Sequence, residues 1–585
     1  DSIARGEKFK KFLATLDVAV IGPNCMGSVG VRQRLYMYPH THVAKLDPGP
    51  VALVTQSGGT LSYVVKSFTE RGLKFSYAIS SGNELDLDLA DYVNFLVDDE
   101  GTRQIILFIE GIRDPAAFML AAGRALAAGK PLIAIKTGRS QKSRDAAQSH
   151  SGAVAGDYAA FLAMCERYGI ITVESLEDML EVTLAFQQGR LPKGPAIAFM
   201  TTSGGTVDLL HDYTDAEGAV VPELGPETVE AIRPHLPPDT PIRNPIDTGA
   251  PVGASGRSAP VEICKAFARD PGVDIVGWCI NMPGTARATG ADEPVKELLA
   301  ATDKPVIAFA RMAHQVNPDG LAAQADTNLW YLQGLLPAVR AMNALWFFAE
   351  RAARSLPALP VAGGNQADCS GAALEAALGR VGLCAPATAR AGDAAEAAEA
   401  AAKVGFPVAL KIVSPQASHK TEVGGVSLGL MDAAAVEAAA ASMAERLKAV
   451  NPSAVIEGYL AQEMVSGVEI LVGARDDPLY GPMIVLGAGG VMVELVRDVA
   501  IRLLPVTKGD VRAMLKELRV TDLLQGFRGG AACDVHALVD AVVALGDFYL
   551  DHREWLADIE INPLMVGPAG KGVRAVDIRA VPRAG

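Results

Sequence analysis

The sequence predicts an α/β protein of three to five domains, built on parallel doubly wound sheets and ending in a mixed α+β region. Short apolar runs such as 51–55 alternate with helical stretches such as 61–71, which is typical of a parallel sheet. The chain has 585 residues, and half of them are hydrophobic, which is enough for several cores. A Pro- and Gly-rich stretch, 355–365, precedes the later region, where 459–465 and 468–473 look like consecutive antiparallel strands.

The composition restricts the class of protein. The net charge is -14, and no basic stripe with interleaved aromatic residues is present, which argues against a nucleic-acid binder. Arg, Glu or Gly interrupts every apolar run before it reaches the length of a membrane span. The seven cysteines lack the spacing of disulfides or metal sites, as is usual in a reduced cytoplasm. We therefore expect a cytoplasmic protein that acts on small molecules.

Residues 1–48 look like the end of a domain. One helix over 7–16 and one strand over 18–21 cannot bury a core by themselves, and the chain begins without an initiator Met. We therefore expect a longer polypeptide whose first domain is mostly missing from this sequence.

Two turns with the sequence Ser-Gly-Gly-Thr follow apolar strands and open helices, at Ser57 and at Ser203. The unpaired N–H groups and the dipole at a helix start favour an anion, and glycine lets a phosphate approach closely. One such turn is common in proteins as a structural feature that binds no ligand. Two of them indicate domains of similar build, whose helix starts could share one phosphoryl group.

The loop after the apolar strand 132–135 carries His150 between two serines. Ligands of a doubly wound sheet bind at the carboxyl ends of its strands, so the residues that follow strands, Ser57, Asn83 and Glu110, share that edge with His150. A lone loop histidine is usually only solvated or hydrogen-bonded. Glu110 could nevertheless orient an imidazole and stabilise it when it is charged or phosphorylated, although a solvated carboxylate is the simpler alternative.

The C-terminal region carries groups suited to nucleotide phosphates. Lys411 lies on the predicted strand 407–413, where the alternative is an ordinary surface lysine. Asn562 and Asp577 offer the oxygen ligands that Mg²⁺ accepts together with phosphate oxygens, although Asn-Pro is mainly a turn signal.

In their order along the chain, these motifs resemble the ADP-forming (NDP-forming) acyl-CoA synthetases, relatives of succinyl-CoA synthetase. The matching segments are 22–27, 56–59, 81–83, 108–111, 149–153, 244–247, 419–425 and 560–564. The resemblance implies the tail of a Rossmann-like CoA-binding domain (1–48), two flavodoxin-like domains (49–190 and 194–354), a linker (355–370) and an ATP-grasp domain (371–585). Most of the CoA-binding domain is absent here, so we expect residues 1–585 alone to form acyl-CoA poorly.

The resemblance also implies roles for residues. His150 is the phosphohistidine, Glu110 is its stabilising partner, and His419 is a second phosphohistidine between ATP and His150. The other implied site residues are Ser57, Gly58, Gly59, Ser203, Gly204 and Gly205 for phosphate, Asn24 and Asn83 for substrate or CoA, Lys411, Gln462, Glu463, Met464, Val465 and Glu469 for ATP, and Asn562 and Asp577 for Mg²⁺.

The function implied by the resemblance is acid–CoA ligation, acid + CoA + ATP ⇌ acyl-CoA + ADP + phosphate, through a phosphohistidine and an acyl phosphate. Its cofactors would be ATP, Mg²⁺ and CoA, and its assembly a homodimer. Two alternatives stay open. One is a ligase or lyase on the same scaffold that acts on an unusual acid, aromatic or sulfonium, and the other is a non-catalytic protein that senses acyl groups or nucleotides.

Overall fold

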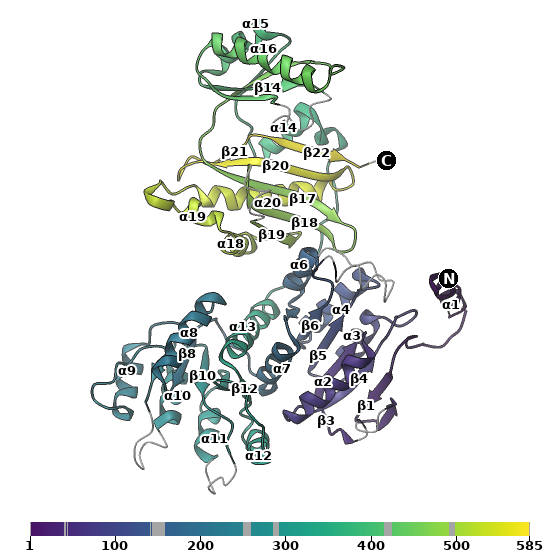
Figure 1. The fold of residues 1–585 in the computed structure, drawn as a ribbon, viewed down its shortest axis with the longest axis vertical. Helices are drawn as coiled ribbons and strands as arrows, with labels where there is room; N and C mark the ends of the chain where they lie inside the picture. Colours follow the sequence, from purple (N-terminus) through teal and green to yellow (C-terminus); the bar gives the residue numbers. More distant parts are fainter. Residues whose placement is uncertain are drawn as a thin grey trace. The chain divides into compact units, whose positions relative to one another are not determined.

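The computed structural model describes residues 2–13, 15–39, 43, 45–140, 142, 158–249, 259–284, 292–414, 424–490 and 498–583. The chain forms two compact units, residues 1–356 and 357–585, coloured purple to teal and green to yellow in Figure 1. In these described ranges, none of the helices has both the length and the apolar character that crossing a membrane requires.

The first sheet of the N-terminal unit has seven strands. They are β1 (Gly27–Gly30), β2 (Leu35–Met37), β3 (Pro48–Thr55), β4 (Phe75–Ser80), β5 (Gln104–Ile109), β6 (Leu132–Lys136) and β7 (Ile171–Thr172). The order β4-β3-β5-β6-β7 is parallel, and it is the order of the flavodoxin fold. The antiparallel strands β1 and β2 extend the sheet beyond β4.

The predicted strand at 18–21 is wrong. Its backbone pairs with a loop instead of a strand, because the N–H of Val20 donates to the carboxylate of Asp86 (2.7 Å) and its carbonyl accepts from the N–H of Leu87 (3.4 Å). The partner groups lie more than 60 residues away, so the local apolar pattern could not indicate them.

The helices of this domain are α2 (Gly58–Glu70), α3 (Leu89–Asp98), α4 (Pro115–Ala127), α6 (Tyr158–Tyr168) and α7 (Leu176–Ala185), and α1 (Ser2–Leu13) precedes the sheet. Asp88 starts α3 with a capping box, and Asp114 caps α4 ahead of Pro115. These polar residues satisfy N–H groups that the first helical turn leaves without partners.

The second sheet repeats the order of the first. Its parallel strands are β8 (Ile197–Thr201), β9 (Ile246–Asp247), β10 (Ile275–Cys279), β11 (Val306–Ala310) and β12 (Tyr331–Gln333), arranged β9-β8-β10-β11-β12. Its helices are α8 (Gly204–Ala216), α9 (Pro226–Ile232), α10 (Ala259–Arg269), α11 (Glu293–Ala300), α12 (Pro318–Thr327) and α13 (Leu335–Ala352). Every residue of β8, β10 and β11 is buried, which is why these strands are apolar runs. The predicted pair of doubly wound domains is confirmed.

A buried ion pair joins the two doubly wound domains. The guanidinium of Arg71 donates to both carboxylate oxygens of Glu181 on α7, at 2.7 and 3.1 Å. The same guanidinium donates to the carbonyl of Tyr331 on β12 (2.9 Å), and Glu181 accepts from the N–H of Gln333 (3.0 Å). Figure 1 shows α7 and α13 side by side between the sheets, and the hydrophobic core is continuous through them.

The C-terminal unit contains two antiparallel sheets. One has the order β13 (Thr388–Ala391), β16 (Gly458–Glu463), β14 (Val408–Val413), β15 (Val426–Leu430) and packs on α15 (Ala394–Val404) and α16 (Ala433–Val450). The other has the order β19 (Val499–Leu503), β18 (Gly481–Ala488), β17 (Val468–Asp477), β20 (Leu556–Val566), β21 (Val573–Ala575), and β22 (Ile578–Pro582) also pairs with β20. Its helices are α14 (Gly371–Arg380), α18 (Lys508–Glu517), α19 (Val520–Leu524) and α20 (Val535–His552).

The predicted consecutive strands at 459–465 and 468–473 are confirmed as β16 and β17, and each lies in an antiparallel sheet, but the two strands belong to different sheets. Both edges of β16 are occupied, by β13 and by β14, so β17 cannot join it. The chain passes from one sheet to the other through residues 464–467. Gly467 has a φ of 158° and lies against the carbonyl of Val566, where a side chain would clash.

Replacing Glu181 by Gln should destabilise the N-terminal unit by about 3 kcal/mol, because the charge of Arg71 then stays buried without a counter-charge. The control is Asp98→Asn, which removes an exposed ion pair with Arg124 of the same N···O distance, 2.7 Å, and should cost less than about 1 kcal/mol. Urea unfolding followed by tryptophan fluorescence measures both losses. Equal losses would contradict the importance of the buried pair.

Candidate functional site

Gln56 joins two loops at the carboxyl edge of the first sheet, where the strand order reverses between β3 and β5. Its amide oxygen accepts from the N–H groups of Glu110 (2.5 Å) and Gly111 (3.0 Å), and its amide nitrogen donates to the carbonyl of Gly111 (2.7 Å). Such a reversal point is where doubly wound sheets bind ligands. Gln56 therefore holds the backbone of Glu110 beside the start of α2.

The start of α2 presents backbone N–H groups at this edge. Ser57 caps the helix by accepting from the N–H of Thr60 (3.4 Å) and from its hydroxyl (2.8 Å). In the described part of the chain, the N–H groups of Gly58 and Gly59 meet no acceptor. A side chain at residue 58 would clash with Met26. These donors and the helix dipole suit an anion.

Asn24 and Asn83, both predicted to contact substrate or CoA, lie together at the same edge. The side-chain amide of Asn24 donates to the side-chain oxygen of Asn83 (3.2 Å), and the N–H of Asn83 donates to the carbonyl of Pro23 (2.8 Å). Gly82 permits this approach, because a side chain there would clash with Pro23. Arg113 donates to the carbonyl of Asn83 (2.8 Å), which adds a cation to the group.

Glu84 is a buried carboxyl group in this edge that the sequence did not indicate. Only 4% of the residue is exposed, and its oxygen Oε1 accepts from the hydroxyl of Ser81 (2.6 Å). Burial is the largest cause and raises the pKa of Glu84 to about 7; the hydrogen bond from Ser81 opposes the rise. A glutamate in a polar loop is normally solvated, so only the neighbouring Asn83 could have drawn attention to it.

Lys136, at the end of β6, is a second residue that the sequence analysis missed. Its ammonium donates to the carbonyls of Glu110 (3.2 Å) and Thr137 (3.1 Å) and lies 5.7 Å from the centre of the Phe161 ring. Burial lowers the pKa of Lys136. The predicted phosphohistidine, His150, lies outside the described residues, in the segment between β6 and α6.

An arginine that the sequence did not indicate lies beside the second Ser-Gly-Gly turn, Ser203 to Gly205, at the start of α8. Arg311 follows β11 and donates to the hydroxyls of Thr206 (2.8 Å) and Thr202 (2.9 Å). It therefore brings positive charge to the start of α8. In the described ranges no hydrogen bond joins this turn to the one at Ser57, so the sharing of one phosphoryl group stays a prediction.

In the C-terminal unit, the predicted nucleotide residues converge from both sheets. The ammonium of Lys411 and the side-chain amide of Gln462, both buried, donate to the carbonyl of Val576 at 3.0 and 3.2 Å. The N–H of Asn562 donates to the carbonyl of Asp577 (3.0 Å). The predicted phosphate lysine and the predicted metal ligands thus lie around one short segment.

The remaining predicted nucleotide residues lie on or next to the segment of chain that connects the two sheets. Glu463 ends β16 and accepts from the N–H of Ala387 (3.1 Å), and Met464 and Val465 follow it. Glu469 is on β17, and its carbonyl accepts from the N–H of Gly489 (2.8 Å). The predicted second phosphohistidine, His419, lies outside the described residues.

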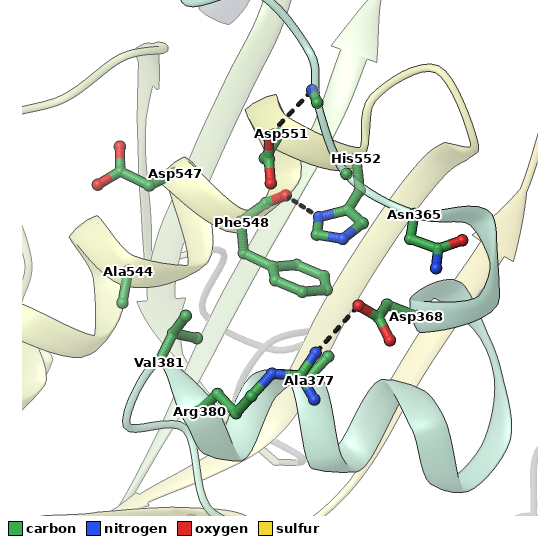
Figure 2. Close-up of a pocket in the computed structure, with 12 residues that line it drawn as sticks. Asn365, Asp368, Ala377, Arg380, Val381, Ala544, Asp547, Phe548, Asp551 and His552 are labelled. Carbon is green, nitrogen blue, oxygen red and sulfur yellow. Dashed lines mark hydrogen bonds and ion pairs between the residues drawn. The ribbon is translucent and has the colours of Figure 1, made fainter.

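A separate groove of about 660 Å³ lies in the C-terminal unit between α20 and α14. Figure 2 shows its ion pair of Asp368 with Arg380 (2.9 Å) and its buried His552, whose ring stacks on Phe548. The predicted site residues that the structure describes do not line it. It is therefore distinct from the candidate site.

The pKa of Glu84 makes the stability of the fold depend on pH. The folded state holds the proton more tightly than the unfolded state, whose ordinary value is 4.5. The stability from this group is complete below about pH 4.5 and is lost as pH rises to about 7, a difference of about 3 kcal/mol. Glu84→Gln should remove this dependence. Urea unfolding at pH 5 and pH 8 tests it, and parallel losses in the wild type and the variant would contradict it.

Comparison with known proteins agrees with this arrangement. A model of the succinyl-CoA ligase like flavodoxin domain matches residues 48–186, and a model of an ATP-grasp domain matches residues 365–581. A trans-feruloyl-CoA synthase from an unknown prokaryotic organism is 31% identical over 588 residues, which cover 96% of this chain and 81% of that protein. An ADP-forming acetate–CoA ligase from Archaeoglobus fulgidus is 30% identical over 585 residues, which cover 96% of this chain and 82% of that protein.

A solved structure is also similar. It is acetyl-coenzyme A synthetase 1 of Ca. Korarchaeum cryptofilum, described as dinucleotide forming, in complex with phosphate and ADP. It matches with a TM-score of 0.52 and 25% identity, over 59% of this chain and 74% of that chain. The family predicted from the motifs is thereby confirmed: the chain belongs to the ADP-forming acyl-CoA synthetases, in which succinyl-CoA ligase-like domains accompany an ATP-grasp domain.

Proposed function

We propose that this chain catalyses acid + CoA + ATP ⇌ acyl-CoA + ADP + phosphate. The observation that carries the proposal is the edge at which Gln56 holds Glu110 beside the N–H groups of Gly58 and Gly59. This edge suits a phosphorylated residue, and the C-terminal unit of the same chain has the ATP-grasp fold. The full-length relatives are named as CoA ligases or synthases.

In the proposed reaction, a nitrogen of His150 attacks the γ-phosphorus of ATP; a nitrogen–phosphorus bond forms, and the bond to ADP breaks. A carboxylate oxygen of the acid then attacks that phosphorus, which releases His150 and gives an acyl phosphate. The CoA thiol loses its proton, its sulfur attacks the acyl carbonyl, and phosphate leaves. A covalent phosphoenzyme divides one difficult transfer into easier steps.

The residues at the edge of the first sheet support these steps in different ways. The Glu110 carboxylate would hold the imidazole of His150 and balance its positive charge, while the N–H groups of Gly58 and Gly59 bind phosphoryl oxygens. Arg311 would supply a further positive charge from the second domain. Asn24 and Asn83 would contact the acid or CoA.

The C-terminal unit would hold the nucleotide. Lys411 would bind phosphate oxygens, Gln462 to Val465 and Glu469 would contact the rest of the nucleotide, and His419 would relay the phosphoryl group. The side-chain oxygens of Asn562 and Asp577 fit Mg²⁺, because both are hard donors and the backbones of the two residues are hydrogen-bonded together (3.0 Å). When bound, Mg²⁺ would neutralise charge on the phosphates.

The acid is a carboxylic acid that we leave open between aliphatic and aromatic compounds, because the names of the relatives include both acetate and a feruloyl group. A panel from acetate to ferulate, assayed for ADP and thioester, identifies it. Release of ADP together with consumption of CoA would exclude a purely sensing protein. The cytoplasmic location and the homodimer stay predictions, and sedimentation of the purified chain tests the second.

Incubation with ATP labelled at its γ-phosphate and with Mg²⁺ should give an acid-labile, base-stable adduct on the wild-type chain. His150→Ala should lose it, because the accepting nitrogen is gone. His536→Ala, which alters an exposed histidine on α20, is the control and should label fully. Full labelling of the His150 variant would contradict the assignment and transfer it to His419.

Lys411→Ala should lose contacts to the nucleotide phosphates, and Asp577→Ala should lose the metal, so both should abolish labelling by ATP. Exchange of labelled phosphate with acyl-CoA does not need the nucleotide and should persist in a chain that binds CoA. Lys403→Ala, at an exposed position on α15, is the matched control. Labelling that survives both changes would show that the nucleotide site is elsewhere.

A further inference from the structure

Lys136 is a buried cation to which the proposed reaction gives no part. It ends β6, and only 6% of the residue is exposed. We propose that Lys136 is a positioning residue, whose ammonium holds the loop of Glu110 and joins the two sides of the segment that carries His150. The inference rests on the proposed function for the roles of Glu110 and His150, but the contacts of Lys136 stand without it.

The ammonium of Lys136 contacts three elements. It donates to the carbonyl of Glu110, which follows β5 (3.2 Å), and to the carbonyl of Thr137, where the chain leaves β6 (3.1 Å). It also lies 5.7 Å from the centre of the ring of Phe161, which is in the first turn of α6. A cation within about 6 Å of a ring centre is attracted by the electrons of the ring. Because His150 lies between β6 and α6 in the sequence, this ammonium binds the chain both before and after it.

The backbone of Glu110 is bound on both sides of its side chain. Gln56 accepts from the N–H of Glu110 (2.5 Å), and Lys136 donates to its carbonyl (3.2 Å). The neighbouring strand supports this arrangement, because the N–H of Thr137 donates to the carbonyl of Ile109 (3.0 Å). With both peptide groups held, the direction of the Glu110 carboxylate depends on its own side-chain rotamers. A carboxylate that must meet an imidazole gains from such a fixed backbone.

A second cation joins the same two stretches of chain. The guanidinium carbon of Arg139 lies 5.3 Å from the centre of the ring of Tyr158, the first residue of α6. The rings of Tyr158 and Phe161 stack, with their centres 6.0 Å apart. Arg139 also donates to the carbonyl of Val173 after β7 (2.9 Å), which fixes its place. Two cations that precede the His150 segment therefore lie against two stacked rings that follow it.

A lysine that only stabilises the fold is the alternative, and Lys130 provides the comparison. Its ammonium donates to three backbone carbonyls at the end of α3, those of Leu96 (3.1 Å), Val97 (2.6 Å) and Asp99 (2.8 Å). Lys130 precedes β6, at the opposite end of the strand from Lys136. Loss of either ammonium removes a donor from backbone carbonyls and lowers stability. Loss of Lys136 should in addition affect the reaction, whereas loss of Lys130 should not.

Hydrogen exchange tests the contacts without substrate. The amides of Glu110 and Thr137 belong to the two residues whose carbonyls Lys136 binds, and both donate hydrogen bonds, so they report local opening. In Lys136→Met, which keeps an apolar side chain and removes the charge, both amides should exchange at least about 10-fold faster than in the wild type. In Lys130→Met both should exchange as in the wild type. Wild-type exchange of these amides in Lys136→Met would overturn the proposal.

Labelling by ATP tests the consequence for the reaction. At saturating ATP, Lys136→Met should slow formation of the phosphoenzyme about 10- to 100-fold with the KM for ATP unchanged, because the proposed nucleotide residues are in the other unit. Lys130→Met should label at the wild-type rate, and urea unfolding measures the stability that each variant loses. A wild-type rate in Lys136→Met, or an equal loss of rate in Lys130→Met, would overturn the proposal.

The aromatic contact separates positioning from a direct contact with phosphate. Phe161 is 1% exposed, so it does not touch a substrate, yet Phe161→Leu removes the ring beside the ammonium and should slow labelling about 3- to 10-fold. Phe118→Leu, at a fully buried position on α4, removes the same volume and should not. If Lys136 acts through this ring, the Lys136 and Phe161 changes together slow labelling by less than the product of their separate effects. Multiplicative effects, or equal losses in both phenylalanine variants, would overturn the proposal.

The two levels of the proposal fail separately. If amide exchange depends on Lys136 but labelling does not, the contacts are supported, and the positioning role in phosphoryl transfer is overturned. If the wild type takes no label from ATP while exchange depends on Lys136, the proposed function is overturned and the contacts are supported. Where Lys136→Met does not fold, Phe161→Leu tests the same contact with the charge in place.

Discussion

The buried ion pair of Arg71 with Glu181 is the contact that makes one unit of two doubly wound domains. Each domain has its own sheet, and each could bury the faces of that sheet with its own helices. Arg71 and Glu181 come from the first domain, yet both also bind the backbone of β12 in the second. Breaking either bond would leave a charge or a backbone group buried without a partner, so the two domains gain stability together.

The architecture of the N-terminal unit could be predicted from the sequence because parallel strands covered on both faces consist of apolar runs. β8, β10 and β11 show this most clearly, since every residue in them is buried. Pairing was harder. Residues 18–21 are apolar but bind a loop through Asp86, and β17 follows β16 without pairing with it. In both cases the backbone partners are distant in the sequence, and local periodicity does not encode them.

The candidate site could likewise be predicted from the sequence only in part. Asn83 could be expected at this edge because it follows a predicted strand, whereas only the family resemblance indicated Asn24; their side chains are hydrogen-bonded there. Glu84, Lys136 and Arg311 could not be identified, because what distinguishes them is burial or a long-range contact. The roles of His150 and His419 rest on their motifs, as both lie outside the described residues.

The hairpin of β1 and β2 has a practical consequence for cutting this protein into fragments. Residues 27–37 precede the first apolar strand of the doubly wound sheet, yet β1 pairs with β4 and covers an edge of that sheet. A fragment that began at residue 49 would leave the hydrogen-bonding groups along β4 unpaired, and exposed strand edges promote association between chains. Crystallisation or antigen fragments of this domain are better started upstream of Gly22, so that the sheet keeps its own protection against aggregation.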